Sequence, residues 1–280
     1  MVIDMLEGAA IPQLLYGTAW KEERSEGLTA LALQAGFRGI DTANQRKHYF
    51  EAAVGKAVQG AIARGEVRRS DIFLQTKFTF QGGQDHRLPY DPRAPVASQV
   101  EQSFQSSLEH FASDYLDSFV LHGPTTRGKL TREDLEAWRA LEALQQAGRT
   151  RFIGISNVTL EQLRELLGLA QVPPRFVQNR CYASTGWDRA VRRLCSEQGL
   201  VYQGFSLLTA NRRELEQASV KKLAARHGRS VAQVVFRFAV AVGMLPLTGT
   251  SSSEHMQQDL GALDFPLEQT EVQLLEKLAG

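Results

Sequence analysis

Cysteine is scarce in this sequence and occurs at only two positions, Cys181 and Cys195. The pair forms neither a CxxC motif nor another spacing typical of metal ligands, so we expect no bound metal. Two thiols in 280 residues also favour a reducing compartment, the cytoplasm, over a secreted and disulfide-bonded protein. Both thiols are therefore expected to be buried and inert.

Long apolar runs and a large excess of charge are missing as well. No segment reaches the roughly 18 apolar residues of a membrane span, and the opening MVIDMLEGAA resembles neither a signal peptide nor an anchor. A formal net charge of +1 disfavours a basic nucleic-acid binder. Neither a low-complexity linker nor a short repeat divides the chain, and we expect a single domain over residues 1–280.

Eight short, β-prone apolar runs alternate instead with stretches of helical period. The runs are Leu14–Gly17, Phe37–Ile40, Ile72–Gln75, Ser118–Leu121, Phe152–Ile155, Phe176–Val177, Leu200–Tyr202 and Leu245–Leu247. The helical stretches are Glu23–Gln34, Phe50–Arg64, Pro95–Phe111, Arg132–Ala147, Leu160–Leu169, Asp188–Gln198, Ser230–Val242 and a final one at Leu267–Leu278. This alternation predicts the α/β class and a parallel (β/α)8 TIM barrel, for which about 250 residues is typical. A doubly wound sheet usually carries G-x-G-x-x-G after its first strand, whereas this chain reads GTAWKEE.

Polar residues follow the predicted strands at the end where TIM barrels place their chemistry. They include Asp41, Lys77, His122, Ser156, Asn157, Gln178, Ser206 and Thr250, together with the aromatic Phe205. Each has a structural explanation when taken alone, such as a cap for Asp41 or a solvated side chain for Lys77. The convergence of an aspartate, a lysine, a histidine and the nearby Tyr49 on one rim favours an active site.

Tyr49 lies in the loop between Asp41 and the next helix. A lysine ammonium held beside a tyrosine favours the phenolate, and an aspartate paired with the lysine keeps that cation in place. Tyr49 could then exchange a proton with a carbonyl oxygen that His122 orients. The carbonyl carbon would need a hydride, which no side chain supplies, so the hypothesis requires a nicotinamide cofactor.

These motifs resemble the aldo-keto reductases along almost the whole chain. The resemblance rests on GIDTA with a following tyrosine, LQTKF, SLEHFASDYLDSFVLHGP, GRTRFIGISNVTLEQL and SVAQVVFRFAVAVGMLPLTGT. It implies an NAD(P)H-dependent reduction of aldehydes or ketones, with Asp41, Tyr49, Lys77 and His122 as a catalytic tetrad. It also implies that cofactor contacts come from Thr18, Ser156, Asn157, Gln178, Phe205, Ser206, Leu207, Leu208, Thr250, His255 and Asp259.

The chain departs from the family pattern near the catalytic groups. The run QRKHY lengthens the loop, and Arg46 stands where strict spacing would place the tyrosine. We assign the role to Tyr49, because this loop holds no other tyrosine. Gly123 and Pro124 replace the aromatic residue that often follows the histidine, which should widen a substrate pocket walled by Trp20.

The residues expected to bind the 2′-phosphate of the cofactor are also less basic than is usual in the family. Gly249 and His255 occupy the two expected basic positions, and a neutral histidine holds a dianion less well than a guanidinium does. Arg212 and Arg213 could compensate or could simply be solvated. We expect NADP(H) to be used with a modest preference, and the use of NAD(H) stays open.

The sequence leaves alternatives open for the function and for one loop. A regulatory barrel that binds the cofactor with little turnover is the alternative function, and a lyase using Lys77 as a Schiff-base nucleophile is a third. The loop Gln81–Pro95 could bring His86, Arg87 and Tyr90 to the substrate or could be an ordered surface loop.

The chain ends soon after its last predicted helix, which suggests an open site. We expect a monomer or small homo-oligomer that binds neither nucleic acid nor membrane.

Overall fold

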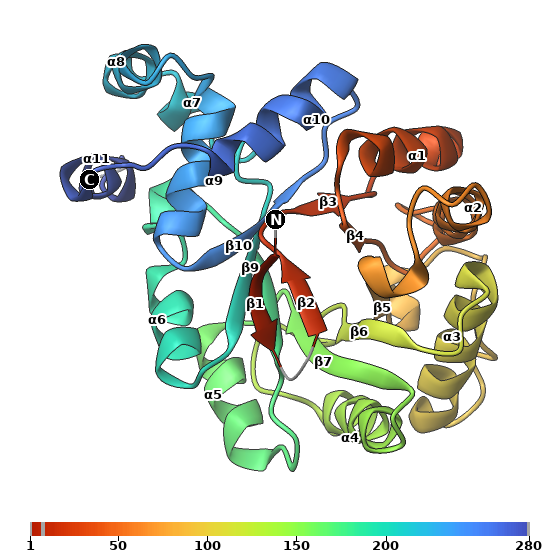
Figure 1. Ribbon diagram of the computed structural model, residues 1–280. Helices are drawn as coiled ribbons and strands as arrows, with labels where there is room; N and C mark the ends of the chain where they lie inside the picture. Colours follow the sequence, from red (N-terminus) through yellow and green to blue (C-terminus); the bar gives the residue numbers. More distant parts are fainter. Residues whose placement is uncertain (1, 7–8, 279–280) are drawn as a thin grey trace.

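A closed barrel of eight parallel strands forms the centre of the computed structural model, which describes residues 2–6 and 9–278 (Figure 1). The strands neighbour one another in the order β10-β3-β4-β5-β6-β7-β8-β9. Their bounds are Leu15–Gly17 (β3), Gly39–Asp41 (β4), Phe73–Phe78 (β5), Leu116–Leu121 (β6), Thr150–Ser156 (β7), Phe176–Arg180 (β8), Val201–Phe205 (β9) and Met244–Thr248 (β10). The predicted barrel is confirmed, and each predicted strand overlaps an observed one.

Helices surround the barrel and cover its strands (Figure 1). Those predicted from periodicity are α1 (Ser25–Ala35), α2 (Glu51–Ala63), α3 (Val96–Phe111), α4 (Arg132–Gln146), α5 (Leu160–Leu169), α6 (Arg189–Glu197), α9 (Val231–Ala241) and α11 (Gln269–Glu276). Local sequence explains where several begin. Thr131, Thr159 and Ser230 each accept a hydrogen bond from the backbone N–H three residues later, which caps α4, α5 and α9.

Other elements were not predicted from the sequence. They are the antiparallel hairpin of β1 (Val2–Leu6) and β2 (Ala9–Pro12), and the helices α7 (Arg212–Leu215), α8 (Ala218–Arg226) and α10 (Ser253–Leu260). The three helices are short and lie in connections that follow β9 and β10, where an apolar stripe is hard to recognise. No helix in the described part of the chain is long and apolar enough to cross a membrane.

The barrel interior is layered because alternate residues of each strand point inward. Its lowest layer is apolar and consists of Leu15, Phe73, Phe152, Phe176 and Leu245, packed with Ile11 from the hairpin. The hairpin therefore closes the end of the barrel at which the strands begin, and Figure 1 shows it in front of the barrel centre. The candidate catalytic residues lie at the opposite end of the barrel, where the strands finish.

Both cysteines are buried and free, as predicted. Cys181 follows β8 and Cys195 lies on α6. Burial raises the pKa of both thiols to about 12. Neither residue is therefore suited to act as a nucleophile near neutral pH.

A glycine sets the distance between α2 and α3. A Cβ atom on Gly55 would lie 1.9 Å from the carbonyl oxygen of His110, so the two helix backbones could not approach as they do. We expect Gly55→Ala to reduce the free energy of unfolding by about 1–3 kcal/mol, the range for overpacking a close contact. Urea denaturation followed by circular dichroism would measure the change.

Gly60→Ala is the matched control because it makes the same substitution in the same helix. Its Cβ would meet the mobile end of Arg64 at 3.1 Å, and alanine favours a helix over glycine by up to about 1 kcal/mol. Gly60→Ala should therefore be neutral or stabilising. Equal unfolding midpoints for the two variants would contradict the close-approach argument.

Candidate active site

A cavity of about 830 Å³ opens where the barrel strands end. Asp41, Tyr49 and His122 line it, together with residues of β8 and of the loops after β3, β7, β9 and β10. Lys77 lies beneath them on β5 and has no exposed surface. The structure thus brings together the aspartate, tyrosine, lysine and histidine that the sequence pointed to.

Lys77 and Asp41 form a buried ion pair. The Lys77 ammonium lies 2.7 and 2.8 Å from the two Asp41 carboxylate oxygens and donates a third bond, of 2.7 Å, to the carbonyl oxygen of Thr42. All three ammonium N–H groups are therefore used. Burial lowers the pKa of Lys77, and the Asp41 carboxylate acts in the opposite direction. A lysine held in this way is poorly placed to attack a carbonyl carbon, which argues against the Schiff-base alternative.

Three glutamines complete the surroundings of Asp41. Gln75 and Gln178 donate to Asp41 Oδ1 at 2.7 and 2.9 Å. Both amides also donate to Gln203 Oε1, at 2.7 and 2.9 Å respectively. These side chains form a polar layer above the apolar floor of the barrel, and they fix the carboxylate from below.

Tyr49, and not Arg46, reaches the cavity. Arg46 pairs with Glu23 at 2.7 Å, and its guanidinium carbon lies 3.8 Å from the centre of the Phe50 ring. The Tyr49 ring meets the His122 ring edge-on, with centroids 5.8 Å apart. Lys77 Nζ lies 5.5 Å from the Tyr49 centroid. The longer loop therefore still places a tyrosine beside the lysine and the histidine.

Burial controls the ionisation of both cavity groups. It raises the pKa of Tyr49 above its ordinary value, an effect that Asp41 strengthens and Arg180 opposes. It lowers the pKa of His122 to about 3, with the Lys77 charge acting in the same direction. Tyr49 is accordingly a protonated phenol at neutral pH, the form that a general acid needs. Burial is the main cause of the raised pKa, and the Asp41 carboxylate acts in the same direction.

His122 is held by a neighbour on the same rim. Thr79 Oγ1 lies 2.6 Å from His122 Nδ1. When the threonine hydroxyl donates this bond, the proton of the neutral imidazole resides on Nε2. His122 can then act as a hydrogen-bond donor at its second nitrogen.

One end of the cavity fits a nicotinamide. Ser156, Asn157, Gln178 and Phe205 line it. The amide nitrogen of Asn157 donates to His122 O at 2.7 Å and that of Gln178 to Asp41. Among the described residues, nothing donates a hydrogen bond to the side-chain oxygen of either. Two amide oxygens beside an aromatic ring suit a carboxamide and its ring.

Six more of the residues predicted to contact the cofactor line the same cavity: Ser206, Leu207, Leu208, Thr250, His255 and Asp259. Lys21 and Arg24, from the segment after β3, line it too, and Lys21 donates a hydrogen bond to the carbonyl oxygen of Gly249. Lys21 thus brings a positive charge from another loop to Gly249, the position where a basic residue was expected. Burial raises the pKa of Asp259 to about 6.

Three non-glycine residues of the cavity lining have a left-handed backbone. They are Trp20, Asn157 and Ser206, with φ values of +61°, +53° and +58°. Non-glycine residues adopt this left-handed region at an energetic cost and often at functional sites. Trp20 is 67% exposed, and its ring centroid lies 4.0 Å from that of His48.

Some predicted site residues lie outside the cavity lining. Thr18 is buried, and its hydroxyl donates to Asp41 O at 3.1 Å. Gly123 packs against Ser156 and Asn157. Arg212 and Arg213 are exposed on α7 and do not line the cavity.

The loop at 81–95 follows the surface-loop alternative. Tyr90 is buried and donates to Thr79 O at 2.8 Å, while Arg87 pairs with Asp85. Neither these residues nor His86 line the cavity.

Sequence reasoning missed four charged or titratable residues of the lining, which are Lys21, Arg24, His48 and Arg180. Arg180 had a usable signal. It follows Gln178 by two residues on one strand, so both side chains point to the same face. His48 directly precedes the assigned tyrosine.

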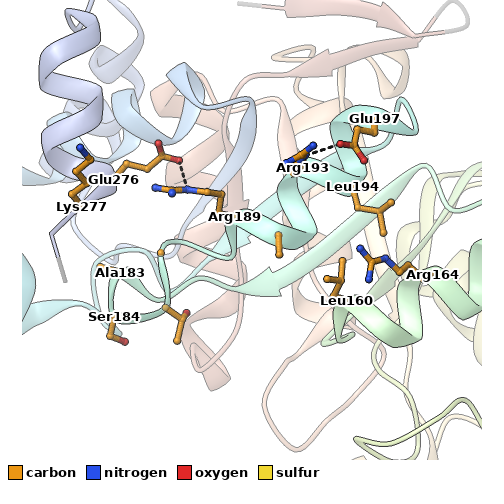
Figure 2. Close-up of a pocket in the computed structure, with 13 residues that line it drawn as sticks. Leu160, Arg164, Ala183, Ser184, Arg189, Arg193, Leu194, Glu197, Glu276 and Lys277 are labelled. Carbon is orange, nitrogen blue, oxygen red and sulfur yellow. Dashed lines mark hydrogen bonds and ion pairs between the residues drawn. The ribbon is translucent and has the colours of Figure 1, made fainter. Parts of the chain in front are cut away.

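A second hollow lies on the barrel exterior between α5, α6 and α11 and has a volume of about 990 Å³ (Figure 2). Its charged side chains largely pair with one another: Arg189 with Glu276 at 3.4 Å and Arg193 with Glu197 at 2.7 Å. None of the predicted site residues lines it. We therefore place the candidate active site at the strand ends.

Comparisons with known proteins agree with this geometry. The model of the "Aldo/keto reductase family" matches residues 13–279. The uncharacterized oxidoreductase YtbE of Bacillus subtilis is 28% identical, covering 97% of this chain and 90% of that protein. The crystal structure of an aldo/keto reductase from Brucella melitensis has 27% identity and a TM-score of 0.83, covering 99% of both chains.

A Bombyx mori aldo-keto reductase in complex with NADP shows the same fold, with 23% identity, a TM-score of 0.83 and coverage of 99% of this chain and 92% of its own. The family match extends over nearly the whole barrel, including every strand that contributes to the cavity. The chain belongs to the aldo/keto reductase family.

Proposed function

We propose that this protein reduces the carbonyl group of an aldehyde or ketone to an alcohol with NADPH. The observation that carries the proposal is the placement of Tyr49 and His122 side by side in the cavity, above the buried Lys77–Asp41 pair. Family membership supports an oxidoreductase. The Bombyx mori relative holds NADP in the same fold.

The four residues divide the work between them. Tyr49, protonated because of its raised pKa, donates its proton to the carbonyl oxygen. Neutral His122 donates a hydrogen bond from Nε2 and orients that oxygen. Lys77 stabilises the tyrosinate that remains, and Asp41 holds the lysine in place. The bound nicotinamide supplies the hydride that the carbonyl carbon receives.

Cofactor binding would use two groups of lining residues. Ser156, Asn157 and Gln178 would hold the carboxamide, and Phe205 would support the ring. Lys21, Arg24 and His255 would face the phosphates, since all three line the cavity and Lys21 donates to the carbonyl oxygen of Gly249. The N-terminus of α10, beginning at Ser253, adds a favourable partial positive charge.

An oxidation assay tests the function directly. Purified protein is supplied with NADPH or NADH and a panel of aromatic aldehydes, aliphatic aldehydes, 1,2-diketones and ketones, and absorbance at 340 nm is followed. We expect turnover with at least one class of carbonyl compound. Tight cofactor binding without turnover of any compound would favour a regulatory or redox-sensing barrel instead.

Tyr49→Phe should identify the proton donor. We expect kcat to fall by roughly 100-fold or more, the scale of lost general acid catalysis, while the Kd for NADPH stays the same. Arg46→Ala is the control from the same loop, because Arg46 pairs with Glu23 away from the cavity. An active Tyr49→Phe variant together with an inactive Arg46→Ala variant would reverse the assignment.

The pH profile of kcat should show no change caused by the ionisation of a histidine. His122 is neutral above its pKa of about 3, and Tyr49 keeps its proton because burial raises its pKa. We therefore expect kcat to vary by less than about threefold between pH 5 and 8 under saturating substrate, since neither group titrates there. A steep change centred near pH 6.5 would show that His122 ionises in the complex.

Cofactor preference should respond to one residue. His255→Arg adds a guanidinium at the phosphate end, and a charge-assisted hydrogen bond contributes about 1.5–3 kcal/mol. We expect Kd for NADPH to fall by about tenfold or more while Kd for NADH changes little, measured by fluorescence quenching at pH 8. Arg212→Ala serves as the comparison and should change neither constant. If Arg212→Ala weakens NADPH binding instead, α7 holds the phosphate.

A further inference from the structure

The cavity contains a guanidinium that the tetrad does not use. Arg180 is the last residue of β8 and lies opposite Phe205 of β9 in the strand register. It shares the inward face of the strand with Gln178 and lines the cavity with Tyr49 and His122. Its guanidinium carbon lies 5.6 Å from the centre of the Phe205 ring.

Arg180 has no anionic partner within the part of the chain that the structure describes. No carboxylate there lies within 4.0 Å of it, and its guanidinium donates no hydrogen bond. Arg180 is exposed, and it shares this lack of an ion pair with surface arginines such as Arg212, but it differs from them in lining the cavity. A guanidinium presents five donors in a fork that matches a carboxylate. An arginine left open in a cavity is therefore equipped to bind an anion.

The phosphates of the cofactor are not the best match for this cation. Lys21 contacts Gly249, and His255 lies on α10, so both belong to the end of the cavity formed after β10. Arg180 lies at the tyrosine end. Its charge acts on the Tyr49 hydroxyl, whose pKa it lowers against the effect of burial. An anion held by Arg180 would be close to the carbonyl group that Tyr49 protonates.

We propose that Arg180 binds a carboxylate of the substrate, which makes the preferred substrate an aldehyde or ketone that also carries an acid group. The inference rests on the proposed reductase function and assigns the substrate class of the same cavity. Trp20 and Phe205 provide apolar surface for the carbon skeleton between the two polar groups. The guanidinium then orients the substrate while Tyr49 and His122 contact the carbonyl oxygen.

The experiment compares two aldehydes of the same skeleton, 4-formylbenzoate, which is an anion, and its methyl ester, which is neutral. The ratio of kcat/KM for the acid to kcat/KM for the ester is measured for the wild type, Arg180→Ala and Arg180→Lys. We expect the wild type to favour the acid, and Arg180→Ala to reduce the ratio by about ten- to a hundredfold, as expected for loss of a charge-assisted pair. Arg180→Lys should give an intermediate ratio, because it keeps the charge but loses the fork.

Two controls separate this role from others. Arg213→Ala removes an exposed arginine outside the cavity and should leave the ratio unchanged. The Kd for NADPH should stay within about twofold in Arg180→Ala. An unchanged acid-to-ester ratio in Arg180→Ala, or a wild type without preference for the acid, would overturn the proposal. An unchanged ratio with weaker NADPH binding would assign Arg180 to the cofactor.

A binding measurement distinguishes failure of the substrate class from failure of the reductase function. Benzoate is titrated into the NADP⁺ complex by calorimetry, for the wild type and for Arg180→Ala. Benzoate binding that depends on Arg180, in a protein that reduces neither of these aldehydes nor any compound of the carbonyl panel, would support the anion site and contradict the reductase function. Turnover of the ester without Arg180-dependent binding of benzoate would leave the reductase function standing and contradict the anion site.

Discussion

The buried ion pair between Lys77 and Asp41 is the interaction on which the rest of the site depends. Removing two charges from water has a large desolvation penalty, which is offset only by good geometry and further hydrogen bonds. Here Lys77 uses all three N–H groups, and Asp41 also accepts bonds from Gln75 and Gln178. Loss of one partner from such a pair costs about 3–5 kcal/mol, so these residues support both the fold and the proposed chemistry.

The barrel architecture makes this arrangement possible. Inward-pointing residues succeed one another along each strand, and on β8 they are Phe176, Gln178 and Arg180. They belong respectively to the apolar floor, to the amide layer that supports Asp41, and to the cavity above it. The apolar floor excludes water from the layer above it. In that layer the glutamine amides donate hydrogen bonds to the Asp41 carboxylate, which water would otherwise hydrate. Strong electrostatic effects at the rim follow from the dry layers beneath it.

The sequence predicted the barrel and most of the cavity because both leave local signals. Apolar runs that end in a polar residue predicted β4 and β5. The residues at these ends, Asp41 and Lys77, are types that often take part in catalysis. The hairpin of β1 and β2 left no such signal, since its role is to pack Ile11 against strands far along the chain. Lys21 was overlooked for a similar reason: its contact with Gly249 joins positions 228 residues apart, and only the folded barrel brings them together.

The direction of the Tyr49 pKa shift was the part that sequence reasoning could least anticipate. A lysine near a tyrosine lowers the pKa of the phenol, but the outcome depends on the net field and on solvation. In the fold, burial dominates and raises this pKa, Asp41 acts in the same direction, and Arg180 opposes them. A phenol that stays protonated is suited to donating a proton to a carbonyl oxygen. In the proposed reduction, the Lys77 ammonium, 5.5 Å from the centre of the Tyr49 ring, stabilises the tyrosinate that remains.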